Sequence, residues 1–325
     1  MRSRPRALIV GAGAIGQSYA IHLARGGCDV TFFVKEKHVA AVSDGITVHL
    51  LGRRSTVTER LTDVNVVTTV AQVAATKWDH VWLAISTPAM RDEIIAEVLG
   101  AVGGATVVVL QQDRGNNEFI ATLVPPAQVV AAEIAVISFS SPLPGRTGPE
   151  GIASYRPPKM ATAICGIEDR VRPLIDVLEK GGMPARQVDD VKRTTALRAG
   201  VVYCLIATVE THAWSLAGLA NSDELRRGLA AARESLAIAS ALEPGAVPRS
   251  SSLALRPSLW RLLLPLLRPL LPRIFPFDIE VYLEYHFSKV GEQVRFAIDD
   301  QLQHGAQLGL PVEQLKSLRA ALNAT

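Results

Sequence analysis

The chain has 325 residues, of which 48% are hydrophobic and 20% charged, which is enough apolar material for about two globular domains. A net charge of +3 without a dominant lysine and arginine block argues against a nucleic-acid partner. Cys28, Cys165 and Cys204 lie far apart and lack the spacing of a metal site or disulfide framework, so we expect reduced thiols, no metal and a cytoplasmic protein.

An apolar run at the start of the chain passes into a glycine-rich turn and then into helical spacing. The run Ala7–Val10 leads into Gly-x-Gly-x-x-Gly, in the strand, turn and helix order that gives this pattern a mechanism. In that order the first glycine makes a tight turn, the second lets a pyrophosphate approach the backbone, and the third lets the helix pack on the strand. The helix start then holds the phosphates. The sequence therefore predicts a dinucleotide site over six residues: Gly11, Ala12, Gly13, Ala14, Ile15 and Gly16.

The end of the second predicted strand, Val30–Val34, favours one dinucleotide over the other. An acid at this point suits the ribose 2′-hydroxyl of NAD, whereas a cation suits the 2′-phosphate of NADP. Lys35 directly follows the strand, so we expect NADP (NADPH) with Lys35 among its ligands. Glu36 keeps NAD open, and a solvated helix start is the other explanation for Lys35.

Up to residue 187, short β-branched runs alternate with helical patterns, as in an open parallel sheet. The predicted strands are Ala7–Val10, Val30–Val34, Val81–Ile85, Thr106–Leu110 and Val129–Ile137. Helices are predicted to begin at Ile15, Pro88 and Asn116, and a loop rich in Pro, Gly and Ser is predicted from Ser140 to Pro158. The predicted fold class is α/β, with a Rossmann-type doubly wound parallel sheet in an NADP-binding domain over residues 1–187.

From residue 188 the pattern changes to long helical periods with little glycine. The predicted helices are Lys192–Ala220, Ser222–Leu242, Asp278–His304 and Val312–Asn323. We therefore expect an all-helical C-terminal domain over residues 188–325, which binds the substrate and carries a homodimer contact.

Residues 253–277 combine many leucines with prolines and arginines. The prolines are Pro257, Pro265, Pro269, Pro272 and Pro276, and the arginines are Arg256, Arg261, Arg268 and Arg273. The segment is too interrupted for a membrane span. Three interpretations remain: an apolar lid over a substrate, a dock at a membrane surface, or a buried subunit contact. We favour the lid and the subunit contact over membrane contact, because prolines spoil a clean amphipathic helix.

Several segments in order resemble the ketopantoate reductase (2-dehydropantoate 2-reductase) family over nearly the whole chain. They are Gly11–Gly16, Gly27–Thr31 with Lys35, Asp79–Ala84, Leu110–Asn116, Ser250–Leu253 and Phe277–Glu280. The resemblance implies a Rossmann domain, a helical domain and an active site in the cleft between them. It also implies hydride transfer from NADPH to a 2-keto acid. The family has only a short connection near residues 253–277, so most of that segment is an insertion.

The chain departs from the family at most positions to which the resemblance assigns catalysis or binding. In the helical domain, Arg198 stands where the family has its lysine general acid, and Val202 and Ile206 stand where it has two helix asparagines. In the Rossmann domain, Gln112 replaces the asparagine of the Leu-Gln-Asn-Gly element, and Ser86 replaces a lysine after the Val81 strand. Asp278 replaces the substrate-binding glutamate. An arginine is a poor general acid, because its pKa lies above about 12, yet it binds carboxylates bidentately. Loss of the two asparagines leaves an apolar wall, which disfavours ketopantoate itself as the substrate.

The working hypothesis is an NADPH-dependent oxidoreductase that reduces a carbonyl or imine of a more hydrophobic substrate than ketopantoate, with a role in secondary metabolism. Its candidate catalytic residues are Arg198, Gln112, Asp278 and Glu210, with Ser86 and Gln112 also near the cofactor. Further proton donors in the expected cleft are Tyr203, His212, Glu280, Tyr285 and His286, although Asp278 and Glu280 also suit a helix N-terminus. The alternative is a cofactor-binding homologue that has lost hydride transfer and acts in binding or in a non-redox reaction such as cyclisation or isomerisation.

Overall fold

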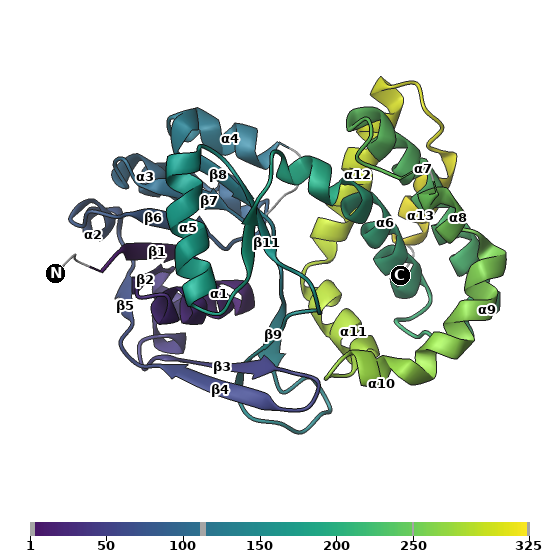
Figure 1. Ribbon diagram of the computed structural model, residues 1–325. Coiled ribbons are helices and arrows are strands. Elements are labelled where there is room, and N and C mark those ends of the chain that lie inside the picture. Colours follow the sequence, from purple (N-terminus) through teal and green to yellow (C-terminus); the bar gives the residue numbers. More distant parts are fainter. Residues whose placement is uncertain (1–3, 111–114, 249, 324–325) are drawn as a thin grey trace. The chain divides into compact units, whose positions relative to one another are not determined.

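The chain forms two compact units, Met1–Val191 and Lys192–Thr325 (Figure 1). The computed structural model describes residues 4–110, 115–248 and 250–323, and of residues 195–199 it describes the backbone only. The first unit combines sheets and helices, and the second is helical. The predicted α/β fold class with a helical C-terminal region is thereby confirmed.

An eight-stranded sheet forms the centre of the first unit, in the order β12-β11-β8-β7-β6-β1-β2-β5. Its strands are β1 (Arg6–Val10), β2 (Asp29–Phe33), β5 (Asn65–Val67), β6 (His80–Leu83), β7 (Thr106–Val109), β8 (Val129–Ala132), β11 (Thr162–Cys165) and β12 (Ala185–Gln187). From β8 to β5 all neighbours are parallel, and β11 pairs antiparallel with β8. The strand order reverses at β1, between β6 and β2. In such sheets, ligands bind beyond the carboxyl ends of the strands at this reversal.

Helices and short 3₁₀ turns connect these strands and cover the sheet. They are α1 (Ala14–Arg25), η1 (Glu36–Ala41), α2 (Val70–Ala74), η2 (Ala89–Arg91), α3 (Glu93–Ala101), α4 (Asn116–Leu123), η3 (Pro126–Gln128) and α5 (Glu168–Lys180). The residues of β1 alternate between two cores. Ala7 and Ile9 pack in the core that holds α1 and α5, whereas Leu8 and Val10 pack with α3 and α4. Burial on both faces explains the unbroken apolar run that predicted this strand.

A second, four-stranded sheet, in the order β4-β3-β10-β9, corrects two predictions. Its strands are β3 (Ile46–Leu51), β4 (Thr56–Leu61), β9 (Ile137–Ser141) and β10 (Gly151–Tyr155). The predicted strand Val129–Ile137 is wrong as one element, because the chain leaves the large sheet after β8 and enters the small sheet at β9. The predicted loop Ser140–Pro158 is wrong where it contains β10. Its partner β3 lies about 100 positions earlier in the chain, so local sequence gave no sign of the pairing.

The second unit consists of helices around one apolar core. They are α6 (Val191–Thr211), η4 (Leu219–Asn221), α7 (Asp223–Leu242), α8 (Ser251–Ala254), α9 (Pro257–Leu267), η5 (Arg268–Leu270), α10 (Leu271–Ile274), α11 (Ile279–Lys289), α12 (Gly291–Gln307) and α13 (Glu313–Ala321). The helix predicted to Ala220 ends earlier, because Ala213 and Trp214 take positive φ angles of 52° and 59°. The helix predicted over Asp278–His304 is two helices, since Val290 leaves helical geometry between α11 and α12.

No helix within residues 4–110, 115–248 and 250–323 is long and apolar enough to cross a membrane. In the same part of the chain, no group of three or more His, Cys, Asp and Glu side chains could hold a metal ion.

Candidate functional site

The glycine turn between β1 and α1 is fixed by the carboxyl ends of two neighbouring strands. The Gly11 amide donates to the carbonyl oxygen of Phe33 in β2 at 3.1 Å, and the Ala84 amide after β6 donates to the carbonyl oxygen of Val10 at 3.0 Å. Gly11 has φ = +97°, a conformation that favours glycine. A Cβ atom there would lie 2.7 Å from Cγ2 of Ile85. Gly11 is therefore required both for its backbone angle and for its lack of a side chain.

The other two glycines of the turn serve different purposes. A Cβ atom on Gly16 would lie 2.1 Å from the carbonyl oxygen of Gly11, so the first turn of α1 rests directly on the loop. A Cβ atom on Gly13, the N-cap of α1, would meet no described atom within 4 Å. The side-chain amide of Gln17, in the first turns of α1, stabilises the glycine turn by donating to the carbonyl oxygen of Ala12 at 2.8 Å. The backbone at Gly13 is therefore open to an incoming group.

The start of α1 has the electrostatics of an anion site. The first turn of this helix contains no acidic residue, and no side chain of the described chain caps it. Ala14 and Ile15 begin the helix, so their amides lie at its positive end. These residues fit a dinucleotide, because the exposed amides and the open side of Gly13 suit a pyrophosphate.

A pocket of about 560 Å³ lies beside this turn, within the first unit. It is lined by Val10, Gly11, Ala12, Gly13, Phe33, Val34, Lys35, Lys37, His38, Ala41, Thr68, Ala84, Ile85, Ala89, Asp92, Ile94 and Ile95. The lining comes from the carboxyl ends of β1, β2 and β6 and from the loops that follow them. This is the sheet edge at which the strand order reverses. The pocket therefore lies where a Rossmann fold binds a nucleotide.

Basic side chains line one side of this pocket. Lys35 follows β2, and its Nζ atom lies 3.3 Å from Oδ2 of Asp92. Both side chains are largely exposed, so the pair is weak and opens at little cost. Lys37 and His38 line the same pocket, whereas Glu36 is not among its lining residues in the described chain. The pocket thus offers cations at the end of β2, where NADP places its 2′-phosphate.

Ser86 and Gln112 are the other two residues that were predicted to lie near the cofactor. Ser86 follows β6 next to the pocket residues Ala84 and Ile85, and its carbonyl oxygen accepts from the Met90 amide at 3.0 Å. Gln112 lies in 111–114, outside the described residues, so its expected contact with the nicotinamide stays a prediction.

A buried polar cluster that sequence reasoning missed joins the loop after β6 to the start of α4. Asn116 is fully buried, and its side-chain Nδ2 donates to Oγ1 of Thr87 at 2.9 Å. Nη1 of Arg91 lies 3.1 Å from the Asn116 side-chain oxygen and 2.9 Å from the Thr87 carbonyl oxygen. These contacts position the two loops at the carboxyl edge of the sheet. In the sequence, Asn116 is a predicted helix start and the last residue of the family-like segment Leu110–Asn116, and neither feature predicts its contacts with Thr87 and Arg91.

In the second unit, Glu210 has a structural partner. Oε1 of this side chain accepts from Nη2 of Arg295 at 2.9 Å, and the Glu210 side chain is only 10% exposed. The same Nη2 atom donates to the carbonyl oxygen of Leu322 at 2.7 Å. Glu210 therefore links α6 to α12 and to the end of α13.

Asp278 and Glu280 lie at the start of α11 and both bind backbone amides. Oδ1 of Asp278 accepts from the amides of Glu280 and Val281, so Asp278 is the N-cap of α11. Oε1 of Glu280 accepts from the Leu216 amide at 2.6 Å. Both residues line a second pocket, of about 860 Å³, together with residues of α9, η5 and α10 such as Leu264. The alternative that Asp278 serves a helix N-terminus thus has direct geometric support, whereas the side chain of Glu280 ties α11 to the loop at Leu216.

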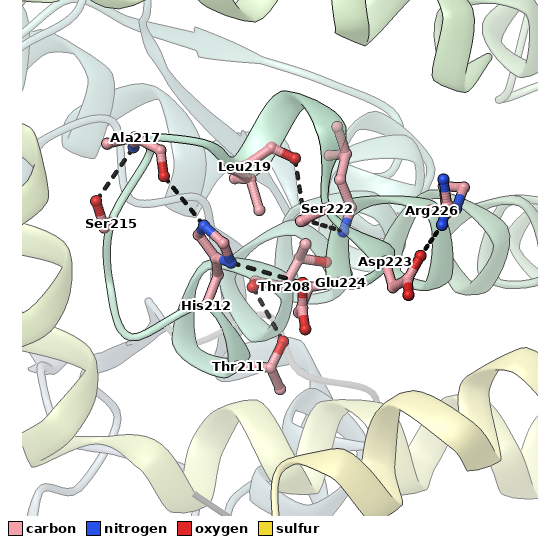
Figure 2. Close-up of polar contacts among 11 residues, drawn as sticks. Thr208, Thr211, His212, Ser215, Ala217, Leu219, Ser222, Asp223, Glu224 and Arg226 are labelled. Carbon is pink, nitrogen blue, oxygen red and sulfur yellow. Dashed lines mark hydrogen bonds and ion pairs between the residues drawn. The ribbon is translucent and has the colours of Figure 1, made fainter.

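His212 lies in the turn that connects α6 to α7 (Figure 2). Its Nε2 atom lies 3.1 Å from the carbonyl oxygen of Ala217, which makes Nε2 the donor, and its Nδ1 atom lies 3.6 Å from Oε2 of Glu224. Ser222, the N-cap of α7, accepts from the Leu225 amide in the same turn. These contacts account for His212 as part of a connection between helices.

The remaining proton-donor candidates also have neighbours in the second unit. The hydroxyl of Tyr203 accepts from Nε2 of Gln293 at 3.1 Å. Nζ of Lys289 lies 3.7 Å from the centre of the Tyr285 ring. Burial lowers the pKa of His286 to about 4, so this ring is neutral at pH 7 and holds no acidic proton to donate.

The positions that replace the family's helix residues lie along α6. Arg198 is in this helix, and its side chain is outside the described part of the chain. Ile206 is buried in the helical core, whereas Val202 is 42% exposed. The apolar wall expected from both residues is therefore supplied at the surface by Val202 alone.

The comparisons with known proteins agree with this geometry. Residues 7–152 match the family described as ketopantoate reductase PanE/ApbA. A sequence comparison with curated proteins finds no match. Among solved structures, the 2-dehydropantoate 2-reductase of Geobacter metallireducens GS-15 is similar at 19% identity and a TM-score of 0.70, over 98% of this chain and 100% of that one.

Two further solved structures bear the same likeness. The PanE/ApbA family ketopantoate reductase of Ralstonia eutropha JMP134 has 18% identity and a TM-score of 0.71, over 98% of this chain and 97% of that one. D-mandelate dehydrogenase with NADH and anilino(oxo)acetate has 14% identity and a TM-score of 0.70 over the same shares. At these identities the likeness shows the fold. Residues 7–152 therefore form a domain of the ketopantoate reductase PanE/ApbA family, and the chain has the fold of solved ketopantoate reductases over nearly its whole length.

Proposed function

We propose that the protein is an NADPH-dependent oxidoreductase that reduces a carbonyl or imine carbon of a substrate more apolar than ketopantoate. The observation that carries this proposal is the open backbone at Gly13 beside a pocket with Lys35, Lys37 and His38 in its lining. When bound, NADPH supplies the hydride. The residues of this chain bind the cofactor, orient the substrate and exclude water.

Two parts of the first unit would hold the cofactor. The amides at the start of α1 suit the pyrophosphate, and Gly13 leaves room for it. Lys35 suits the 2′-phosphate, which would replace Asp92 as its partner. Because the Lys35–Asp92 pair is exposed and worth at most about 1 kcal/mol, this exchange costs little.

The substrate assignment rests on the residues that replace the family's catalytic set. Arg198 would bind a carboxylate of the substrate, and Gln112 would donate to its carbonyl oxygen. The hydrogen bonds of Glu210 and Asp278 favour supporting roles for these two acids. A protonated imine carries its own proton, and a keto acid would take one from water, so neither substrate needs a lysine acid.

The apolar character of the substrate has two supports. Val202 offers an exposed aliphatic side chain where the family has an amide. D-mandelate dehydrogenase, solved with NADH and anilino(oxo)acetate, has the same fold. Mandelate and anilino(oxo)acetate are both organic acids with an aromatic ring. We therefore propose a 2-keto acid, or the imine derived from one, with an apolar substituent.

Cofactor binding and turnover should be measured separately. Titration of NADPH and NADH by fluorescence enhancement gives the two affinities. NADPH oxidation is then followed against aromatic and branched aliphatic 2-keto acids, aldehydes and imines. We expect tighter binding of NADPH than of NADH, and turnover of an apolar keto acid or imine.

A second candidate function has a specific observation in its favour. The two acidic side chains proposed for catalysis, Glu210 and Asp278, are held by hydrogen bonds that serve the helical fold. This suits a cofactor-binding homologue without hydride transfer, active in a non-redox reaction such as cyclisation or isomerisation. NADPH binding without turnover across the substrate panel would favour it over the oxidoreductase.

A further inference from the structure

The helix α9 and the turn that follows it present a row of exposed leucines. Leu259, Leu262, Leu263, Leu266, Leu267 and Leu270 recur at spacings of three and four, so they share one side of the helix. Each is between 36% and 64% exposed. Within the helical unit, Figure 1 shows α9 at the rim, between α8 and α10. We call these six residues the leucine face.

The opposite side of α9 already anchors the segment. Leu264 is buried in the helical core and Trp260 packs against it. Nε1 of Trp260 donates to the carbonyl oxygen of Ala254 at 2.7 Å, and Nη2 of Arg233 donates to the carbonyl oxygen of Leu255 at 2.6 Å. Because these contacts hold the helix without using the leucine face, that face is free to serve another purpose.

The prolines divide the segment 253–277 into short helices, as the sequence predicts, yet the eleven residues of α9 form one amphipathic helix. Pro257 occupies the first turn of α9, where a missing amide costs nothing. Pro265 lies inside α9, and the helix continues past it to Leu267. An amphipathic helix is therefore present in this segment despite its prolines.

The charged residues of the same segment are all positive. Between Glu243 and Asp278 the sequence has no Asp, Glu or Lys and five arginines: Arg249, Arg256, Arg261, Arg268 and Arg273. The last four are exposed in the structure. Within the described chain, Arg268 forms an ion pair with Glu280, in which Nη2 lies 3.7 Å from Oε2. The leucine face therefore lies in a strongly basic surface segment.

We propose that the leucine face docks on an anionic lipid surface. A helix with leucines on one face and exposed arginines elsewhere in the same segment suits the boundary between head groups and acyl chains, where leucines enter the apolar region and arginines meet anionic head groups. A second copy of the chain would bring another set of these arginines against the first, which disfavours self-association through this face. The face is also long: eleven residues of helix extend about 16 Å, more than one small keto acid covers.

The test is vesicle flotation with the full-length protein. Vesicles of phosphatidylcholine alone are compared with an equimolar mixture of phosphatidylcholine and phosphatidylglycerol. We expect binding to the mixture that weakens with added salt, and little binding to phosphatidylcholine. Leu262→Ser with Leu266→Ser, the two most exposed leucines of the face, should weaken binding by about tenfold or more.

Two controls decide between explanations. Val57→Ser with Leu308→Ser removes two other exposed aliphatic side chains, at 52% and 42%, and should leave vesicle binding unchanged. Far-ultraviolet circular dichroism checks that both double variants are folded. Equal binding by wild type and Leu262→Ser/Leu266→Ser, or no binding of wild type to the anionic vesicles, would overturn the proposal. A change of oligomeric mass in the leucine variant by sedimentation, without any vesicle binding by wild type, would assign the face to a second copy instead. NADPH affinity measured in parallel keeps this result separate from the proposed reductase function.

Discussion

Individual glycines of the turn after β1 make separable contributions to folding and to binding. Gly13→Ala places a methyl group in open space at φ = −70°, which any residue adopts, so the free energy of unfolding should change by about 1 kcal/mol or less. The same methyl group occupies the space proposed for a pyrophosphate, so the dissociation constant for NADPH should rise about tenfold or more. Urea unfolding and fluorescence titration measure the two quantities.

Two other glycines provide the controls for that experiment. Gly11→Ala should lower the free energy of unfolding as well as the NADPH affinity, because it adds backbone strain of about 1–3 kcal/mol and a contact with Ile85. Gly100→Ala, in α3, also meets open space and should change neither binding nor folding adversely. Unaltered NADPH affinity in Gly13→Ala would remove the basis of the cofactor site.

The charge of Lys35 should determine the choice between the two nicotinamide cofactors. Lys35→Ala removes a cation from the end of β2, so NADPH affinity should fall about tenfold while NADH affinity stays within about twofold. Lys77→Ala, an exposed lysine outside this pocket, is the matched control. Equal losses for both cofactors in Lys35→Ala would indicate that this side chain does not meet the 2′-phosphate.

Two buried histidines make stability depend on pH. Burial lowers the pKa of His80 and of His286 to about 4, from 6.5 in an unfolded chain. Below pH 6.5 the unfolded chain therefore binds protons that the folded protein does not. The contribution of these two histidines to the free energy of unfolding is therefore full above pH 6.5 and should be lost as pH falls toward 4, by up to about 3 kcal/mol for each histidine.

Urea unfolding at pH 7.5 and pH 5 measures this loss. His286→Phe keeps a ring in contact with Tyr282 and removes one titrating group, so it should reduce the loss. A pH dependence of the variant identical to that of wild type would show that His286 is protonated equally in the folded and unfolded chains.

At the scale of elements, the ion pair between Glu210 and Arg295 links three parts of the helical unit. Glu210→Gln leaves the partly buried Arg295 without its acid, so the free energy of unfolding should fall by about 3 kcal/mol. Arg295→Gln should cost a similar amount, and the double variant should cost much less than the sum. If the pair is purely structural, substrate turnover by folded Glu210→Gln should match wild type. A loss of kcat in folded Glu210→Gln that Arg295→Gln does not share would restore Glu210 as a catalytic acid.

The predictability of an element depended on where its contacts lie. The strands β1, β2, β6 and β7 were predicted from unbroken apolar runs, and α1 from the glycine turn that begins it. The strand β10 was missed because its apolar residues pair with β3, far away in the sequence. The break between α11 and α12 at Val290 was missed because apolar spacing continues across it.

The same distinction applies to the candidate site. Of the residues predicted to bind a dinucleotide, Gly11, Ala12, Gly13 and Lys35 line one pocket, and their binding role stays a prediction. The sequence pointed to them because a short motif and a place directly after a strand are both local features. The cluster of Asn116, Thr87 and Arg91 was missed, since it joins two loops that are adjacent only in the folded sheet. The ion pair of Glu210 could not be predicted from the sequence either, because its partner Arg295 lies 85 positions away.

At the scale of the whole molecule, the first unit carries the pocket proposed for the cofactor, and the helical unit carries Arg198, Val202 and the leucine face. The fold is that of the ketopantoate reductases, while the residues at the positions of their lysine and asparagines differ. The proposed function combines nicotinamide binding by the first unit with a substrate that differs from ketopantoate.

Isothermal titration calorimetry of the full-length protein with NADPH and NADH tests the central claim most directly. The account predicts one site per chain for NADPH, a weaker site for NADH, and dissociation constants about tenfold or more higher for both in Gly13→Ala. No heat of binding from either dinucleotide at millimolar concentration would contradict it.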